Sequence, residues 1–323
     1  MPTRRRFLRL SAAALATPAL PRLANAQAWP AKPIRAMIPF SAGSTVDIVG
    51  RIVLEPLATQ LGHPIVIENR GGAGGSIGSA MVAKADPDGY TILINASAHS
   101  AAPAAYPNLS YDVANDFAAV IPFGSVPNVT VIAPDRGIKT LRELVDAAKK
   151  GSFTFASAGV GSATHFAAER LRLSAGFQAV HVPFKGGPEA LTEVMTGRVD
   201  FMSIGISSGL PFIRDGKLLA LAVSTPKRSP TLPDVPTTIE AGYPDSDYTF
   251  WNGMLVPAKT PREIIDKLYT ETEKALKNPA VVQKFAPQGI DPMPMKPAEF
   301  DALIKREVDI NMALVKAAGI KFN

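Results

Sequence analysis

The sequence predicts an α/β protein with two lobes, and three observations lead to this fold class. Short runs of strand-forming residues alternate with amphipathic stretches of helical period, a rhythm typical of parallel sheets covered by helices. The 323 residues exceed what one hydrophobic core organises well, so two lobes are expected. Two turns rich in glycine and serine each connect a predicted strand to a predicted helix.

The first 26 residues are expected to be an export signal and not part of the fold. Arginines at positions 4, 5, 6 and 9 precede an alanine-rich apolar run, and Ala24-Asn25-Ala26 fits a cleavage site. The paired arginines favour the twin-arginine route, with the general secretory route left open. Cleavage after Ala26 would leave the mature chain in the periplasm. No apolar run reaches the roughly 20 residues that span a bilayer, so we expect no membrane insertion of the mature chain.

The net charge of +6 comes mainly from this segment. Residues 1–26 contain five arginines and no acid, so the remaining chain has a formal charge of +1. This balance gives no reason to expect a nucleic-acid partner. The sequence has no cysteine, so the exported protein is expected to fold without disulfides and to carry no lipid on a cysteine.

Strand-type and helical patterns alternate through most of the chain. Capping boxes at Thr140 with Glu143 and at Thr260 with Glu263 predict two helix starts, and from Thr260 onward only helical patterns occur. Strands are expected at 34–38, 64–68, 91–95, 129–133, 153–157, 179–183, 199–203 and 219–224, and helices at 48–61, 76–84, 141–149, 164–174 and 188–196.

The first turn of interest follows the strand at 34–38 and has almost no side-chain bulk. A ligand can therefore approach its backbone closely, and the first N–H groups of the next helix have no partner inside that helix. Unpaired donors at the positive end of a helix dipole attract an anion. The alternative is an ordinary turn that binds nothing. The residues of this turn are Ser41, Ala42, Gly43, Ser44 and Thr45.

The second turn repeats this pattern from Ser157 to Ser162, between the strand at 153–157 and the helix at 164–174. His165 lies in the first turn of that helix, where a neutral imidazole can donate a hydrogen bond or simply pack. As a lone histidine it is more often structural than a ligand contact. Two anion-binding turns without a nucleophile, base or metal between them indicate binding and not catalysis. No cofactor is expected.

Other chemistries are less well supported by the sequence. The glycines at 71–75 fit neither G-x-G-x-x-G nor the Walker spacing, so a flexible turn is expected there. The four histidines show no metal-binding spacing and no thiol is available, so no metal site is expected.

A serine hydrolase remains an alternative because the segment from Gly205 to Gly209 matches G-x-S-x-G with Ser207 at its centre. In hydrolases with this motif the histidine follows the serine, but all four histidines here precede Ser207. Other chain orders exist on other folds. This alternative predicts ester hydrolysis that is lost in Ser207→Ala.

The chain resembles the Bug-type substrate-binding receptors of tripartite tricarboxylate transporters over nearly its whole length after residue 26. Each matching segment is weak alone, but together they occur in the order of the family. They read IPFSAGSTVDIVGR, VIENRGGAGGSIGS, DPDGYTIL, YDVANDFAAV, SAGVGSATHFAAERL, VPFKGGPEALTEVMTGRVDFM, GKLLALAV, LPDVPTTIEAGYP and LVPAKTP.

The resemblance implies a type II periplasmic binding protein, a Venus-flytrap fold of two α/β lobes joined by two crossover strands. Lobe one would comprise 27–125 and 225–323 and lobe two 126–224, with crossings near 122–131 and 221–226. The implied partners are a small organic carboxylate and the membrane permease subunits, and the receptor is expected to be a monomer. An orphan receptor that presents its ligand to a sensor kinase is the alternative.

The resemblance also implies which residues surround the ligand, through backbone N–H groups, hydroxyls and waters and without an arginine. Asp47 would organise the first turn or meet a donor on the ligand, because like charges repel. Ser203 begins a segment in which members often carry an acid. Phe250 and Trp251 could form an apolar wall or pack in the core. The implied contacts are Ser41, Ala42, Gly43, Ser44, Thr45, Asp47, Ser97, His99, Ser157, Gly159, Gly161, Ser162, His165 and Ser203.

Overall fold

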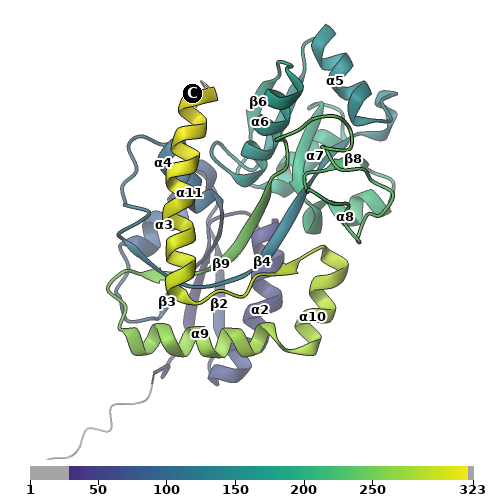
Figure 1. The fold of residues 1–323 in the computed structure, drawn as a ribbon. Coiled ribbons are helices and arrows are strands. Elements are labelled where there is room, and N and C mark those ends of the chain that lie inside the picture. Colours follow the sequence, from purple (N-terminus) through teal and green to yellow (C-terminus); the bar gives the residue numbers. More distant parts are fainter. Residues whose placement is uncertain (1–28, 319–323) are drawn as a thin grey trace, which may run out of the picture.

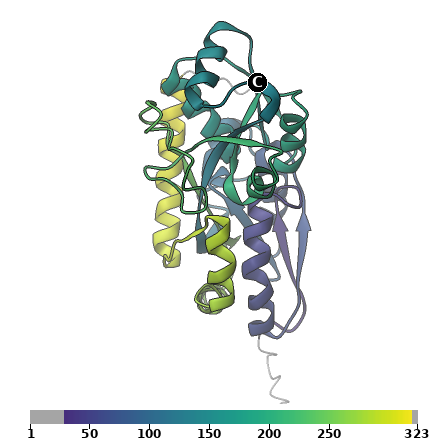
Figure 2. The same cartoon turned by 90° about the vertical axis from the view of Figure 1, so that its right-hand side faces the viewer.

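The computed structural model describes residues 29–318, so the predicted export signal at 1–26 lies outside the described residues. Its strands form one hydrogen-bonded path in the order β2-β1-β3-β9-β4-β7-β5-β6, with β8 and β10 also paired to β4. The path divides into two lobes, one around β1 to β3 and β9 and the other around β5 to β8 (Figures 1 and 2). The predicted two-lobe α/β fold is therefore confirmed.

The first lobe combines parallel and antiparallel pairing. β1 pairs in parallel with β2 and β3, as the sequence predicts, but β9 runs antiparallel to β3. The expectation of purely parallel sheets is therefore wrong for this strand. The strands are β1 (Ile34–Ile38), β2 (Ile65–Asn69), β3 (Thr91–Ala96), β9 (Thr249–Pro257) and the short β10 (Asp291–Pro292).

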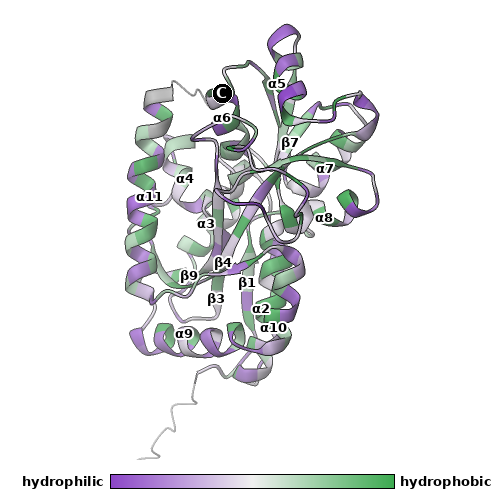
Figure 3. Cartoon of the chain, turned by 45° about the vertical axis from the view of Figure 1, so that its right-hand side comes forward, coloured by the Kyte–Doolittle hydropathy of each residue, from purple (hydrophilic) through white to green (hydrophobic). Residues whose placement is uncertain are grey.

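Helices cover both faces of the first lobe. Residues of α2 and α9 share one hydrophobic cluster with β1 and β3, and residues of α4 and α11 share another cluster on the opposite face. The helices are α2 (Thr45–Leu61), α3 (Ser76–Ala83), α4 (Ala98–Ala105), α9 (Arg262–Leu276), α10 (Pro279–Phe285) and α11 (Pro297–Ala318). In Figure 3, α9 and α11 alternate between hydrophilic and hydrophobic residues, as helices with one buried face do.

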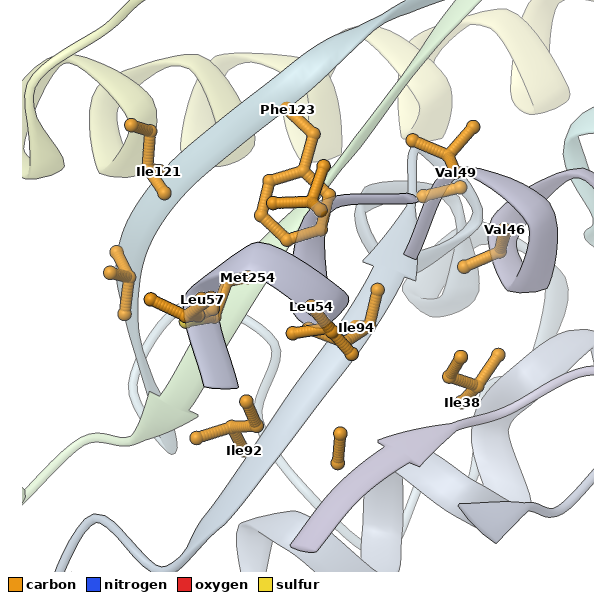
Figure 4. Packing of buried hydrophobic residues seen from close by; sticks show 14 of the residues in the cluster. Ile38, Val46, Val49, Leu54, Leu57, Ile92, Ile94, Ile121, Phe123 and Met254 are labelled. Atoms are coloured by element: carbon orange, nitrogen blue, oxygen red, sulfur yellow. The ribbon is translucent and has the colours of Figure 1, made fainter. Parts of the chain in front are cut away.

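The core under α2 explains why this helix is fixed in place. Val46, Val49 and Leu57 are buried and lie on one side of the helix, in the cluster that also contains Ile38 of β1 and Ile94 of β3 (Figure 4). Burying a side chain of this size contributes about 1.5–3 kcal/mol. The start of α2 is therefore held firmly against the ends of β1 and β3.

The second lobe has a parallel core of three strands. β5 pairs in parallel with β6 and β7. The elements are α5 (Leu141–Lys150), β5 (Thr154–Ser157), α6 (Ala163–Ala175), β6 (Val180–Pro183), α7 (Gly187–Met195), β7 (Phe201–Gly205), α8 (Ile206–Arg214) and β8 (Leu219–Val223). The cap predicted at Thr140 is confirmed, since its hydroxyl accepts the N–H of Glu143 at 3.1 Å. The cap predicted at Thr260 is wrong, because this hydroxyl donates to the carbonyl of Pro257.

The long strand β4 (Phe117–Ile132) connects the lobes. It pairs antiparallel with β9 up to Pro127, and from Asn128 it pairs antiparallel with β7 and β8. On the way back, residues up to Tyr243 still pack against the second lobe, and the chain rejoins the first lobe at Thr249. β4 and β9 thus lie side by side where the lobes meet.

The helix α11 is fastened to the first lobe by a largely buried carboxylate. Glu307 accepts hydrogen bonds from the hydroxyl of Ser100 at 2.6 Å and from the indole N–H of Trp251 at 2.8 Å. Burial raises the pKa of Glu307, although these two hydrogen bonds act in the opposite direction. None of the helices within residues 29–318 has the length and apolar character needed to cross a membrane.

We expect Glu307→Gln to remove the pH dependence that the raised pKa of Glu307 gives to the stability of the protein. A raised pKa in the folded state means that the stability contributed by Glu307 is fully present below its unfolded pKa and is lost as pH rises through the folded pKa. Glutamine can accept both hydrogen bonds but does not titrate. The free energy of unfolding of the wild type, relative to Glu307→Gln, should therefore fall between pH 4 and pH 7, as measured by urea unfolding.

The control for this prediction is Glu307→Ala, which leaves the buried N–H of Trp251 without an acceptor. It should lose about 2 kcal/mol or more of stability at both pH values. A difference between wild type and Glu307→Gln that does not change with pH would contradict the prediction.

Candidate functional site

The first turn is ordered by a buried carboxylate. Asp47 is 3% exposed and accepts the N–H of Gly43 at 2.8 Å, the guanidinium N–H of Arg51 at 2.9 Å and the amide of Asn69 at 3.0 Å. Burial favours its neutral form, but the hydrogen bonds outweigh burial and lower the pKa of Asp47. Its charge is therefore balanced within the first lobe. This agrees with the expected role of Asp47 in organising the turn.

The second turn is ordered mainly by hydroxyl groups and a histidine. The N–H of Ala158 donates to the hydroxyl of Thr164, and the N–H of Gly161 donates to Nδ1 of His165 at 3.1 Å. The hydroxyl of Ser157 accepts the N–H of Gly159. Several amides that could have faced a ligand are thus already bonded within the turn. The backbone groups left for a ligand belong to the start of the helix itself.

Both helices begin with the same serine cap. Ser44 accepts the N–H of Asp47 at the start of α2, and Ser162 accepts the N–H of His165 at the start of α6. The two residues between each cap and its partner are Thr45 and Val46 in α2, and Ala163 and Thr164 in α6. Within residues 29–318, the backbone N–H groups of these four residues meet no acceptor. Each helix therefore presents two adjacent free donors at its positive end.

The two helix starts meet at one small cavity between the lobes. Its volume is about 30 Å³, room for a group of a few atoms. All four residues with free N–H groups line it, and no lining side chain is charged. The lining residues are Phe40, Ser44, Thr45, Val46, Ala96, Ala98, Ala158, Ser162, Ala163, Thr164, Gly187, Ile204 and Phe250.

Direct hydrogen bonds hold the lobes together around the cavity. The hydroxyls of Thr45 and Ser208 lie 3.0 Å apart, and Ser41 donates to Glu189 at 2.6 Å. The hydroxyl of Tyr106 in the first lobe donates to the carbonyl of Val160 in the second turn at 2.8 Å. These contacts join the two lobes on either side of the cavity.

His165 has a structural position in the second turn. Its ring stacks on His181 with centroids 3.8 Å apart, and its Nδ1 accepts the N–H of Gly161. Burial, together with His181 and Arg172, lowers the pKa of His165 to about 2. Burial also lowers the pKa of His181 to about 4, and Nε2 of His181 lies 2.6 Å from the hydroxyl of Ser157. Both imidazoles are therefore neutral at physiological pH.

The structure separates the predicted contacts into three groups. Ser44, Thr45 and Ser162 line the cavity. A second group lies in or next to the two turns without lining the cavity; it consists of Ser41, Ala42, Gly43, Asp47, Ser157, Gly159, Gly161 and His165.

The third group lies away from the cavity. The hydroxyl of Ser97 accepts the N–H of Trp251 at 3.0 Å. His99 packs edge-on against Phe117 with ring centroids 4.7 Å apart, and burial lowers its pKa to about 3. Ser203 is fully buried in β7, with its hydroxyl 3.3 Å from that of Thr130.

Sequence reasoning did not identify several residues of the cavity wall. Val46, Ala163 and Thr164 follow the cap serines directly, so the serine caps could have pointed to them. Phe250 was considered as an apolar wall, and it does line the cavity. Ala96 and Ala98 flank Ser97, which the resemblance implies as a contact, and both line the cavity. Ile204 gave no signal, because apolar residues in strands are common in any core.

The geometry gives no support to the other chemistries considered. Ser207 is 1% exposed and its hydroxyl meets no hydrogen-bond partner within the described part of the chain, so it has no histidine as a base. Among residues 29–318 no group of histidine and carboxylate side chains is placed to hold a metal ion. The cavity between the two lobes is the candidate binding site.

Fold and site together define a two-lobe solute-binding protein. The sequence profile of the tripartite tricarboxylate transporter family receptor matches residues 49–320. The chain belongs to this family. Protein BugT of Bordetella pertussis is 33% identical over 314 residues, which cover 95% of each chain. The resemblance noted in the sequence is thereby confirmed.

Solved structures agree with this assignment. The periplasmic binding protein BugD is 33% identical, with a TM-score of 0.88 over 91% of this chain and 99% of its own. Rpa4515 of R. palustris with adipate is 29% identical, with a TM-score of 0.87 over 90% of this chain and 99% of its own. MatC from Rhodopseudomonas palustris with bound malate is 31% identical, with a TM-score of 0.84 over 89% of this chain and 100% of its own.

Proposed function

We propose that the protein is a periplasmic receptor that closes on a small organic carboxylate and delivers it to the membrane permease of a tripartite tricarboxylate-type transporter. One observation carries this proposal: Thr45 and Val46 of one lobe and Ala163 and Thr164 of the other, whose N–H groups have no acceptor among residues 29–318, line the same cavity. A carboxylate between them would accept hydrogen bonds from both lobes and so favour closure.

The family supports the chemical class of the ligand. Adipate and malate are the ligands named for two solved relatives. A carboxylate bound by several N–H and O–H donors reaches micromolar affinity, about −8 kcal/mol, without a charged partner. Such an affinity permits release to a permease. We further propose that the protein acts as a monomer and catalyses no reaction.

The remaining assignments belong to the same proposal. Cleavage after Ala26 would release the mature chain into the periplasm. The first boundary between the lobes would fall near residue 125. The packing of residues up to Tyr243 on the second lobe favours a second boundary at Thr249, later than the residue 225 that the resemblance implies. Ser44, Thr45 and Ser162 would contact the ligand, while Ser41, Gly43, Asp47, Ser157, Gly159, Gly161 and His165 would hold the turns that present it.

A binding screen of residues 27–323 tests this function. Succinate, glutarate, adipate, malate, citrate, acidic amino acids and aromatic acids would be compared by thermal shift and then by calorimetry. A true ligand at 100 times its Kd should stabilise the protein by about 2.7 kcal/mol. NMR of the ligand should show it unchanged after incubation, and Ser207→Ala should bind equally well. Absence of binding by every acid, or conversion of one of them, would refute the proposal.

A further inference from the structure

Asn252 is a buried polar residue near the cavity. Its side chain takes no part in the contacts described above. It lies in β9, is fully buried, and within residues 29–318 neither its amide oxygen nor its amide nitrogen has a hydrogen-bond partner. A buried amide without partners is unfavourable, because it gives up its hydrogen bonds to water and receives none in return. Such a group in a native protein calls for an explanation.

A second buried asparagine in the same sheet shows the usual arrangement. Asn95 in β3 is 1% exposed; its amide nitrogen donates to Ser79 at 3.0 Å and its oxygen accepts the N–H of Ala96 at 2.8 Å. Asn95 is therefore explained by the fold alone. Asn252 differs from it in that both of its polar atoms are available.

The register places Asn252 directly behind the cavity wall. Its partner in β3 is Ala96, and side chains of directly paired residues lie on the same face, with β-carbons about 5 Å apart. Phe250, two residues earlier in β9, lies on that face as well. Ala96 and Phe250 both line the cavity. Asn252 does not itself line the cavity, but its directly paired neighbour Ala96, whose side chain is a single methyl group, does.

We propose that Asn252 determines specificity by binding the uncharged, hydrogen-bonding far end of the carboxylate ligand. This inference rests on the proposed function, in which the carboxylate itself lies at the starts of α2 and α6. The free N–H groups at the two helix starts serve the first carboxylate and no lining residue is charged, so a second ionised group would lose its hydration and gain neither those donors nor a counter-ion. A carboxamide offers one acceptor and two donors, which match an amide or hydroxyl on the ligand.

Matched pairs of probes test this proposal on the wild-type protein. Succinate, glutarate and adipate would each be compared with the half-amide of the same length, which carries one charge fewer, by calorimetry at neutral pH. We expect one half-amide to bind at least about tenfold more tightly than its diacid, since only the half-amide buries no unpaired charge. Binding of the diacids as tight as that of the half-amides would overturn the proposal and leave the proposed function intact.

Two variants separate recognition from folding. Asn252→Leu replaces the amide by an apolar group of similar volume; it should keep or raise the unfolding temperature and lose the half-amide preference. Asn95→Leu should lower the unfolding temperature and keep that preference. If Asn252→Leu destabilises the protein as much as Asn95→Leu, or if it retains the preference, Asn252 is structural and the proposal fails. If no probe binds the wild type, the proposed function fails and this inference fails with it.

Discussion

Replacing Gly74 with alanine is expected to weaken ligand binding about a hundredfold, equivalent to about 2.7 kcal/mol, with little change in the fold of either lobe. Gly74 has a φ of +59°, and a β-carbon there would overlap the carbonyl oxygen of Val160 in the opposite lobe. That oxygen also accepts the hydroxyl of Tyr106. The added methyl group would therefore keep the lobes apart and raise the free energy of the closed, ligand-binding form.

Calorimetry gives the affinity, and small-angle scattering reports whether saturating ligand still makes the molecule more compact. Gly62→Ala is the matched control, because Gly62 has a φ of +71° and no atom near its missing β-carbon. An alanine with a positive φ should lower the free energy of unfolding by about 1–2 kcal/mol in both variants. Gly62→Ala should nevertheless bind the ligand with wild-type affinity. Normal affinity and normal compaction in Gly74→Ala would show that closure does not require this contact.

Replacing Ala163 with proline is expected to reduce affinity by roughly tenfold to a hundredfold, the effect of removing one hydrogen bond to a charged group. Proline deletes the N–H of Ala163, the first residue of α6 and one of the four cavity-lining residues with a free N–H group. The helix should tolerate it, since proline is favoured at this position and the preceding Ser162 has an extended ψ of 160°.

Ala163→Gly is the control for this second prediction, because it removes the methyl group and keeps the N–H. It should bind within a few-fold of the wild type, and both variants should unfold within about 1 kcal/mol of it. Wild-type affinity in Ala163→Pro would mean that the start of α6 does not hold the ligand. A loss of affinity in both variants would point to packing of the methyl group instead.

The two turns could be predicted from the sequence because their chemistry is local. Small residues between a strand and a helix, with a serine cap at each helix start, determine where free N–H groups occur, and Ser44 and Ser162 take that role in the structure. The opposition of the two turns across one cavity could not be read from local pattern alone. It depends on how β4 and β9 join the lobes, and the family resemblance supplied that expectation.

The strands that join the lobes were the hardest part to predict. The sequence indicated a strand only at 129–133, whereas β4 begins at Phe117, because Pro122, Gly124 and Pro127 interrupt its pattern. β9 was missed as well, since most of its residues are buried on both faces and show no alternation. The resemblance implied His99 and Ser203 as ligand contacts, but both side chains are buried outside the cavity lining, a placement that depends on tertiary packing and leaves no local pattern.

The pairing of β4 with β9 limits how the lobes can move. Because β4 belongs to both sheets as a continuous strand, closure amounts to bending a hydrogen-bonded ribbon, and free rotation about a loose tether is not available. The lobes therefore lose little orientational entropy when they close. Little of the interaction energy between the ligand and the helix starts is then spent on ordering the lobes. A small ligand can therefore hold the two lobes together.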